Sequence, residues 1–382
     1  MSARIQDLFH EHFGAGGTLV RSPGRVNLIG EHTDHNLGFV LPAAVDKGIN
    51  LVIGLRADRQ LNFLAMDKHQ TYHGDLDRIQ SDPSQWPNYL LGVLEQFRAL
   101  GLEPRGVDCV FGGDVPIGCG LSSSAALEGG FAFGLNELLG FGLDRVALAQ
   151  LSQRSENQFV GVNCGIMDPF ASLLGRQGRL IKLDCRDLSY DYIPFEWPDI
   201  RIVLCDTQVR RALTGSEYNV RRSQCEQGVA LLQQRVPGIA SLRDASPAML
   251  EAHRDAFPPE VFRRCAYVVA ENQRVLAACA DLERGDLAAF GAAMNATHEG
   301  LAHGYEVSCP ELDVLAEAAQ SMPGVLVARM MGAGFGGCTI NLVQADHLAG
   351  FRNRMAPVFR DRLGREPVMH VCQLQGGTRI VE

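Results

Sequence analysis

Short apolar runs and longer amphipathic stretches are mixed along the whole chain. Apolar runs bounded by glycine or polar turns predict strands at 40–55, 61–66, 107–111, 179–184, 200–205, 325–331, 339–343 and 368–372. Helical periodicity predicts helices at 83–100, 122–139, 144–158, 216–235, 259–282, 286–303 and 347–363. Because these elements alternate irregularly, without steady βαβ repeats, the pattern favours an α+β fold over a doubly wound sheet.

The length of the chain predicts more than one domain. A chain of 382 residues is longer than one ordinary hydrophobic core supports. Around residues 188–198 the sequence becomes polar and aromatic and contains two prolines, which suits a crossing between domains. We therefore expect an N-terminal domain at 1–195 and a C-terminal domain at 196–382.

The composition restricts the possible partners and the compartment. A net charge of −9 argues against nucleic acid or an anionic membrane as the main partner. The eleven cysteines form no CxxC pair, and several lie in apolar runs, which indicates reduced thiols in a cytoplasmic protein. No histidine or cysteine group has zinc-ligand spacing, so the sequence argues against a dedicated zinc site.

The sequence shows neither a secretory signal nor a membrane span. The first fourteen residues have no apolar region typical of a secretory signal. The apolar stretch 125–143 contains charged and polar residues, so it predicts a core helix rather than a membrane span.

The stretch 22–39, SPGRVNLIGEHTDHNLGF, is dense in hydrogen-bonding side chains: Arg25, Asn27, Glu31, His32, Asp34 and His35. A core segment would need a partner for each charge, whereas a solvated loop would have no use for the apolar patch at 26–29. The pattern favours a strand that delivers polar groups into one pocket. Carboxylates beside a neutral imidazole suit a ligand with several hydroxyls, such as a sugar.

The segment 116–128, PIGCGLSSSAALE, joins a glycine-rich loop to a helix start. Gly118 and Gly120 would let backbone N–H groups approach an anion, and the following serines would begin a helix whose dipole favours phosphate. The alternative is an ordinary helix N-cap with small residues for packing. The loop is not of the Walker type, because no lysine follows its glycines.

Two carboxylates in the segment 156–170, ENQFVGVNCGIMDPF, are further candidates for chemistry. Asp168 lies among small and apolar residues and is either a turn former before Pro169 or a catalytic base. Glu156 lies late in the predicted helix 144–158 and either faces solvent or reaches a magnesium ion.

Two later segments are weaker signals. In the segment 206–222, arginines surround Ser216 and Tyr218, which indicates either a capped, solvated helix start or a ligand site with arginines that neutralise phosphate: Arg210, Arg211, Arg221 and Arg222. The segment 331–338, MGAGFGGC, predicts a tight glycine turn between strands, and taken alone it is weak support for nucleotide binding.

Taken together and in this order, these segments resemble the galactokinase family of the GHMP kinase superfamily. The resemblance runs from residue 22 to residue 338 and rests on five motifs, GRVNLIGEHTDHN, GCGLSSSAALE, NCGIMD, SEYN and GAGFGGC. It implies an S5-like N-terminal domain, a ferredoxin-like C-terminal domain and an active site in the cleft between them. It also implies a monomer that phosphorylates the C1 hydroxyl of D-galactose with Mg-ATP, the first committed step of galactose catabolism.

Residue by residue, the resemblance implies the following roles. Asp168 would be the base that faces the C1 hydroxyl, and Arg25 would hold that carboxylate ionised and stabilise charge during transfer. The implied sugar contacts are Glu31, His32, Thr33, Asp34, Gly165 and Tyr218. The implied ATP contacts are Gly118, Cys119, Gly120, Leu121, Ser122, Ser123 and Ser124, with Ser124 and Glu156 at Mg²⁺ and Trp86 near the adenine.

The sequence departs from the family pattern at four positions: His35 stands where tyrosine is usual, Cys119 for alanine, Pro169 for glutamine and Ala333 for glycine. His35 and Pro169 border the sugar site, so a GHMP kinase for N-acetylgalactosamine or arabinose is an alternative. A catalytically silent sensor of galactose and ATP is another, although Arg25, Ser124 and Asp168 are all present. The dense polar set at 31–34 argues against a generic ATP-binding protein.

Overall fold

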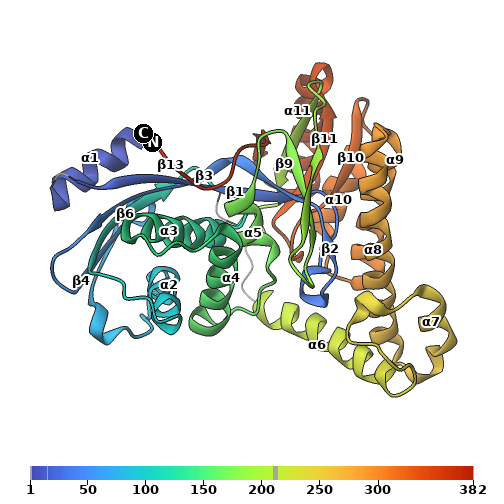
Figure 1. Ribbon diagram of the computed structural model, residues 1–382. Coiled ribbons are helices and arrows are strands. Elements are labelled where there is room, and N and C mark those ends of the chain that lie inside the picture. Colours follow the sequence, from blue (N-terminus) through green and yellow to red (C-terminus); the bar gives the residue numbers. More distant parts are fainter. Residues whose placement is uncertain (1, 15, 117, 210–213, 382) are drawn as a thin grey trace.

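The computed structural model describes residues 2–14, 16–116, 118–209 and 214–381, with the side chains of 214–216 left out (Figure 1). It contains a six-stranded, a four-stranded and a three-stranded sheet together with helices. The predicted α+β class is therefore confirmed. Among the described residues, none of the helices is both long and apolar enough to cross a membrane.

The six-stranded sheet forms the N-terminal half and has the order β13-β1-β3-β6-β4-β5. Its strands are β1 (Thr18–Asn27), β3 (Pro42–Leu55), β4 (Gln60–Ala65), β5 (Gln70–Asp75), β6 (Val107–Gly113) and β13 (Arg379–Ile380). Helix α1 (Ser2–Phe13) covers one face, against β3 and β6. On the other face, α3 (Ser123–Leu139) and α5 (Met167–Leu174) pack on β1 and β3, and α2 (Asn88–Ala99) and α4 (Arg145–Ser155) pack on α3 (Figure 1).

The four-stranded sheet forms the C-terminal half and has the order β10-β11-β9-β12. Its strands are β9 (Ile200–Asp206), β10 (Val325–Met330), β11 (Cys338–Gln344) and β12 (Met369–Cys372). The helices of this half are α6 (Thr214–Gln233), α7 (Pro247–Ala252), α8 (Pro259–Glu283), α9 (Leu287–Glu299), α10 (Pro310–Gln320) and α11 (Leu348–Pro357). Helices α9 and α10 pack on β10, and α8 packs on α9.

A small third sheet lies beside α8 and consists of β2 (Phe39–Val40), β7 (Arg179–Asp184) and β8 (Tyr190–Pro194). At the end of the chain, β13 pairs with β1, so the two termini lie close together beside the N-terminal sheet (Figure 1). A boundary between residues 195 and 196 stays a prediction.

Most predicted strands and helices are confirmed, with differences at helix ends. The helix predicted from residue 83 begins at Asn88, because the Asp82 carboxylate accepts the N–H of Ser84 (2.8 Å) and holds a turn ahead of it. The helix predicted to reach residue 303 ends at Glu299 and continues as a wide π-helical turn, Gly300–Tyr305. The segment expected as a domain crossing contains β8, and α1, α5, α7 and α10 were not predicted.

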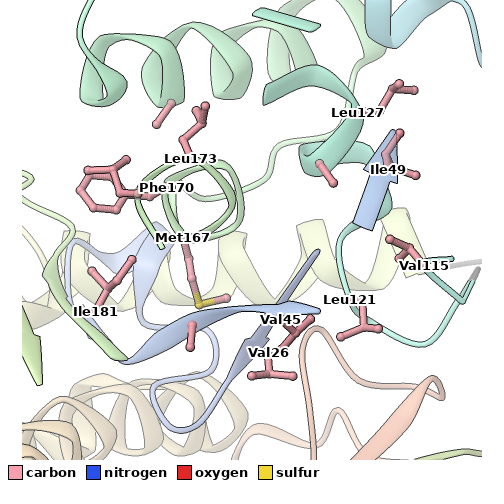
Figure 2. Packing of buried hydrophobic residues seen from close by; sticks show 14 of the residues in the cluster. Val26, Val45, Ile49, Val115, Leu121, Leu127, Met167, Phe170, Leu173 and Ile181 are labelled. Atoms are coloured by element: carbon pink, nitrogen blue, oxygen red, sulfur yellow. The ribbon is translucent and has the colours of Figure 1, made fainter. Parts of the chain in front are cut away.

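One hydrophobic core holds the candidate site elements in place. Met167 and Phe170 of α5, Val26 of β1 and Leu121 of the serine-rich loop (residues 116–124) belong to the same buried cluster, and Figure 2 shows all four in one view. Buried side chains in such a core are close-packed and resist displacement. The strand, the loop and the helix that carry the candidate chemistry are therefore fixed relative to one another.

Candidate functional site

Two cavities meet where three segments come together: the signature strand (β1 and its continuation to residue 39), the serine-rich loop (residues 116–124) and the glycine turn (residues 331–338). The first has a volume of about 330 Å³ and is lined by five of the predicted sugar contacts: Glu31, His32, Asp34, Gly165 and Tyr218. The second, of about 250 Å³, is lined by six predicted ATP contacts: Gly118, Gly120, Leu121, Ser122, Ser123 and Ser124. Arg25, Asp168, Gly332 and Ala333 line both cavities, so Arg25 and Asp168 lie at their junction.

Asp168 is held between an arginine and a serine. It lies in the first turn of α5, where a negative charge is favoured by the helix dipole. Arg25 places Nε 2.8 Å and Nη2 2.7 Å from Asp168 Oδ1, and the Ser122 hydroxyl donates to Oδ2. Arg25 Nη1 also donates to the carbonyl of Gly120, so a single guanidinium joins the carboxylate to the loop.

Gly24 explains how β1 comes so close to the loop. The N–H of Arg25 donates to the carbonyl of Leu121 at 3.0 Å. A Cβ atom at residue 24 would lie 2.7 Å from that same carbonyl oxygen, which is too close for a real side chain. Glycine at this position therefore permits the contact that sets Arg25 beside the loop.

The first cavity contains buried acceptors with no protein partner. Glu31 Oε1 forms an ion pair with Arg329 (3.0 Å) and accepts the N–H of Gly332 (3.3 Å), whereas Oε2 has no hydrogen-bond partner among the described residues. His32 places Nε2 3.3 Å from the carbonyl of Ala333, and its buried Nδ1 likewise has no partner there. A buried acceptor without a donor is costly, so both atoms are suited to accept hydroxyls of a ligand.

The charge states of this cavity suit hydroxyl binding. Burial, together with the nearby His35, lowers the pKa of His32 to about 3, so the imidazole is neutral at physiological pH. Burial alone would raise the pKa of Asp34, but the hydrogen bond and charge of His35 outweigh it and lower that pKa. The cavity thus offers one neutral imidazole and an ionised carboxylate.

The buried His32 predicts a pH-dependent stability. Its folded pKa of about 3 is below the ordinary value of 6.5, so between these values the unfolded chain binds a proton that the folded chain excludes. Stability should therefore fall as the pH is lowered from about 6.5, by about 1.4 kcal/mol per pH unit from this residue. Urea unfolding at pH 7 and pH 5 should show a smaller loss for His32→Asn than for wild type. The exposed His10→Asn should lose as much stability as wild type; equal losses in all three proteins would contradict the assignment.

His35 contacts several side chains on the side of the cavity where α6 lies. Its Nδ1 lies 2.9 Å from the hydroxyl of Tyr218 and 3.3 Å from Asp34 Oδ1, and its Nε2 lies 3.4 Å from the hydroxyl of Tyr305. The family departure at position 35 therefore touches two of the predicted sugar contacts.

Gly165 is required by the position of Asp34. A Cβ atom at residue 165 would overlap the Asp34 carboxylate. We expect Gly165→Ala to displace Asp34 and raise KM for galactose, the sugar that the family resemblance implies, by about tenfold or more, with KM for ATP unchanged. Steady-state kinetics with each substrate varied in turn checks this. Gly350→Ala, where an added Cβ meets no atom within 4 Å, is the control; an unchanged galactose KM in Gly165→Ala would be the contrary result.

The serine-rich loop differs from a simple capped helix. Ser122 occupies the N-cap position of α3 with φ 56°, but its side chain makes no cap hydrogen bond and donates instead to Asp168. Gly118 and Gly120 both have positive φ, at 83° and 73°. These features favour the phosphate-loop interpretation over the alternative of an N-cap.

Glu156 and Ser124 form a candidate cation site beside the loop. Burial, and secondly the charge of Asp168, raise the pKa of Glu156 to about 7, while hydrogen bonds from Cys164 and Ser124 oppose the shift. A carboxylate and a hydroxyl are oxygen ligands of the kind that Mg²⁺ prefers. The buried Glu156 carboxylate has too little nearby positive charge to balance its own charge, and it lies beside the serine-rich loop that is expected to bind phosphate. A divalent cation would balance both charges.

Several predicted residues lie elsewhere. Thr33 lines neither cavity, because its hydroxyl donates to the carbonyls of Gly30 (2.8 Å) and Phe39 (2.6 Å) and so secures the turn. Cys119 also lines neither cavity, since its side chain is fully buried behind the loop. Trp86 packs against Phe111, with ring centroids 5.6 Å apart, and lines neither cavity.

The arginine cluster around Tyr218 is only partly described. Arg210 and Arg211, and the side chain of Ser216, lie outside the described residues. Arg221 donates to the carbonyls of Tyr305 (3.0 Å) and Glu306 (2.8 Å), and Arg222 pairs with Glu226 (3.0 Å). These two arginines are engaged by the protein itself and line neither cavity, so their role in neutralising phosphate stays a prediction.

Other cavity residues were not singled out from the sequence. Asn163, Asn219 and Gly332 line the first cavity, and Arg329 holds Glu31. Ala333 also lines this cavity and was noted in the sequence only as a departure from the family pattern. Arg329 did offer a signal, because a single arginine inside the apolar run 325–331 must find a partner when that strand is buried. The asparagines stand inside recognised motifs but carry no distinguishing pattern of their own.

Comparisons with known proteins identify the family. The galactokinase galactose-binding signature matches residues 7–55, the GHMP kinases N terminal domain matches 88–176, and the GHMP kinases C terminal model matches 278–359. A galactokinase of Roseiflexus sp. (strain RS-1) is 41% identical over 377 residues, covering 98% of this chain and 96% of that protein. The chain belongs to the galactokinase family.

Solved structures support the same placement within the GHMP kinases. The structure of Lactococcus lactis galactokinase complexed with galactose has a TM-score of 0.96 at 36% identity and covers 99% of both chains. A mevalonate kinase, at 18% identity and a TM-score of 0.62, shares the fold alone. The two-domain GHMP architecture predicted for this galactokinase family member is therefore confirmed.

Proposed function

We propose that the protein is a galactokinase, which transfers the γ-phosphoryl group of ATP to the C1 hydroxyl of D-galactose and forms galactose 1-phosphate and ADP. The observation that carries the proposal is the junction of the two cavities. Asp168 and Arg25 line both the cavity rich in acceptors and the cavity formed by the serine-rich loop. A sugar hydroxyl and a terminal phosphate would meet at this junction.

The roles follow from what phosphoryl transfer requires, namely positioning, in-line approach and neutralisation of charge. Asp168 accepts the proton of the C1 hydroxyl as the oxygen attacks phosphorus, and the bond to the leaving ADP oxygen breaks. Arg25 holds Asp168 in place and offers positive charge beside the loop. Neither residue forms a covalent bond to the substrate.

The sugar would be recognised by acceptors and donors on three elements. Glu31 Oε2 and His32 Nδ1 accept hydroxyls, and ionised Asp34 accepts another. Tyr218 approaches from α6, and Gly165 leaves room for Asp34. Thr33 contributes by shaping the turn rather than by contact.

The nucleotide would bind with its phosphates along the loop from Gly118 to Ser124, at the start of α3. Ser124 and Glu156 would hold Mg²⁺, which neutralises charge on the phosphates when bound. The cytoplasmic location and the monomeric state expected from the sequence stay proposals.

The activity is tested by ADP release with a panel of hexoses, pentoses and N-acetylhexosamines, each at the same concentration with Mg-ATP. We expect galactose to give the highest kcat/KM of the panel. The panel is needed because His35, a departure from the family pattern, contacts both Tyr218 and Asp34. A higher kcat/KM for N-acetylgalactosamine or arabinose would identify another sugar kinase, and galactose binding with no ADP release would identify a sensor.

A further inference from the structure

Two cysteines that are far apart in the sequence meet behind the serine-rich loop. Cys119 lies between Gly118 and Gly120, with its side chain fully buried and directed away from the cavity that the loop lines. Cys338 opens β11 immediately after the glycine turn and is also fully buried. Neither thiol has a role in the proposed transfer.

A carboxylate completes a compact group with these thiols. Asp206, the last residue of β9, stands opposite Cys338 in the antiparallel register, so both side chains share one face of the sheet. The Sγ atoms of Cys119 and Cys338 and a carboxylate oxygen of Asp206 all lie within 4.8 Å of one another. Asp206 Oδ1 accepts the N–H of Gln208 at 2.7 Å, a bond that orients the carboxylate.

His370 lies on the same face and can supply a fourth ligand atom. His370 belongs to β12 and pairs with Leu204 of β9. Leu204 is two residues from Asp206, so the side chains of His370 and Asp206 point to the same side of the sheet. The interaction with Cys338 lowers the pKa of Cys119 to about 7 against the opposing effect of burial, and an interaction with His370 acts in the same direction as Cys338. The Nε2 atom of His370 is buried and has no hydrogen-bond partner among the described residues.

Two thiolates, a carboxylate and an imidazole are the ligands that a tetrahedral Zn²⁺ ion takes in proteins. Zinc bond lengths of about 2.0–2.3 Å imply ligand atoms roughly 3.3–3.8 Å apart, so Cys119, Cys338 and Asp206, whose ligand atoms lie within 4.8 Å of one another, need only small side-chain movements. His370 lies outside this group of three and would have to turn toward it. Thiolates are soft ligands, so this group differs in chemistry from the oxygen pair of Ser124 and Glu156.

We propose that Cys119, Cys338, Asp206 and His370 bind one soft divalent cation of the Zn²⁺ type, which ties the serine-rich loop to the C-terminal sheet. Binding forms two metal–sulfur bonds and releases the protons of thiols that were protonated, with no change of oxidation state. The ion lies behind the loop and leaves the nucleotide cavity open. It restrains the backbone between Gly118 and Gly120, so it changes KM for ATP without changing KM for galactose.

Cobalt binding to the full-length protein tests the site directly. Reduced, chelator-treated protein is titrated with Co²⁺ in the absence of substrates, so that the readout does not depend on activity. Excess Mg²⁺ is present to occupy the proposed oxygen ligands Ser124 and Glu156. We expect one equivalent of Co²⁺ to give a thiolate-to-cobalt charge-transfer band in the near ultraviolet, which Zn²⁺ abolishes by displacement. Cys119→Ala and Cys338→Ala should lose the band, and His370→Ala should weaken Co²⁺ binding by at least about tenfold.

The matched control is Cys205→Ala, because Cys205 adjoins Asp206 in β9 but packs into the hydrophobic cluster on the opposite face. It should keep the band, and the thermal unfolding of each metal-free variant shows whether it is folded. Absence of the band in wild type, an equal loss in Cys205→Ala, or a Cys119–Cys338 disulfide in place of metal binding would overturn the site. If Zn²⁺ leaves KM for ATP unchanged in wild type, the link to the loop is wrong.

Discussion

Replacing Asp168 with asparagine should lower kcat by about 10²–10⁴-fold, the range that loss of a positioned general base produces. Asparagine keeps the size of the side chain but cannot take up the proton of the C1 hydroxyl. The galactose-binding acceptors at Glu31, His32 and Asp34 are untouched, so galactose affinity should change much less than kcat. Steady-state ADP release and calorimetric binding of galactose measure the two quantities separately.

Asp168→Asn also removes the negative charge that pairs with the buried guanidinium of Arg25, so the variant could lose stability as well as activity. Arg25 is 4% exposed and pairs with Asp168 at 2.7 Å, so thermal unfolding must show that Asp168→Asn is folded at the assay temperature. Asp187→Asn, at an exposed aspartate in the turn before β8 that lines neither cavity, is the matched control. A folded Asp168→Asn protein with wild-type kcat would rule out the assigned role of Asp168.

The composition of the site could be predicted from the sequence because its residues stand in short, dense motifs. Glu31, His32 and Asp34 are close in sequence, and a strand followed by a tight turn delivers all three to one cavity. Asp168 and the loop serines were identified by their glycine and small-residue surroundings. Strands such as β7 were predicted to the residue, because their ends coincide with clear changes in polarity.

The remaining features depend on contacts between distant segments, which periodicity and spacing do not encode. Thr33 belongs to the signature, but its hydroxyl is used by two carbonyls that only the folded turn brings near. Ser122 resembles an N-cap in sequence, yet its hydroxyl goes to Asp168 on another helix. Cys119 and Cys338 have no motif spacing because different halves of the chain supply them.

Arg329 is the second residue whose loss should have a large effect. Its side chain is fully buried and donates to the carbonyls of Leu28 (3.0 Å), Asn27 (2.6 Å) and Met330 (2.5 Å) while it pairs with Glu31. An arginine of the C-terminal sheet thus binds the backbone of the signature strand and its first predicted sugar contact. We expect Arg329→Met to lower the free energy of unfolding by about 3–5 kcal/mol, because the variant leaves the buried Glu31 charge unpaired.

A double variant separates the two roles of this ion pair. Arg329→Met with Glu31→Gln removes the unpaired charge, so urea unfolding should show recovery of a substantial part of the stability lost in Arg329→Met. KM for galactose should stay high in the double variant, since Glu31 Oε2 is the acceptor that we assign to a sugar hydroxyl. Arg274→Met is a suitable control, because Arg274 pairs with another buried glutamate, Glu271, that lines neither cavity. If the double variant is no more stable than Arg329→Met, the stability of this region depends on the carbonyl contacts of Arg329 rather than on charge compensation.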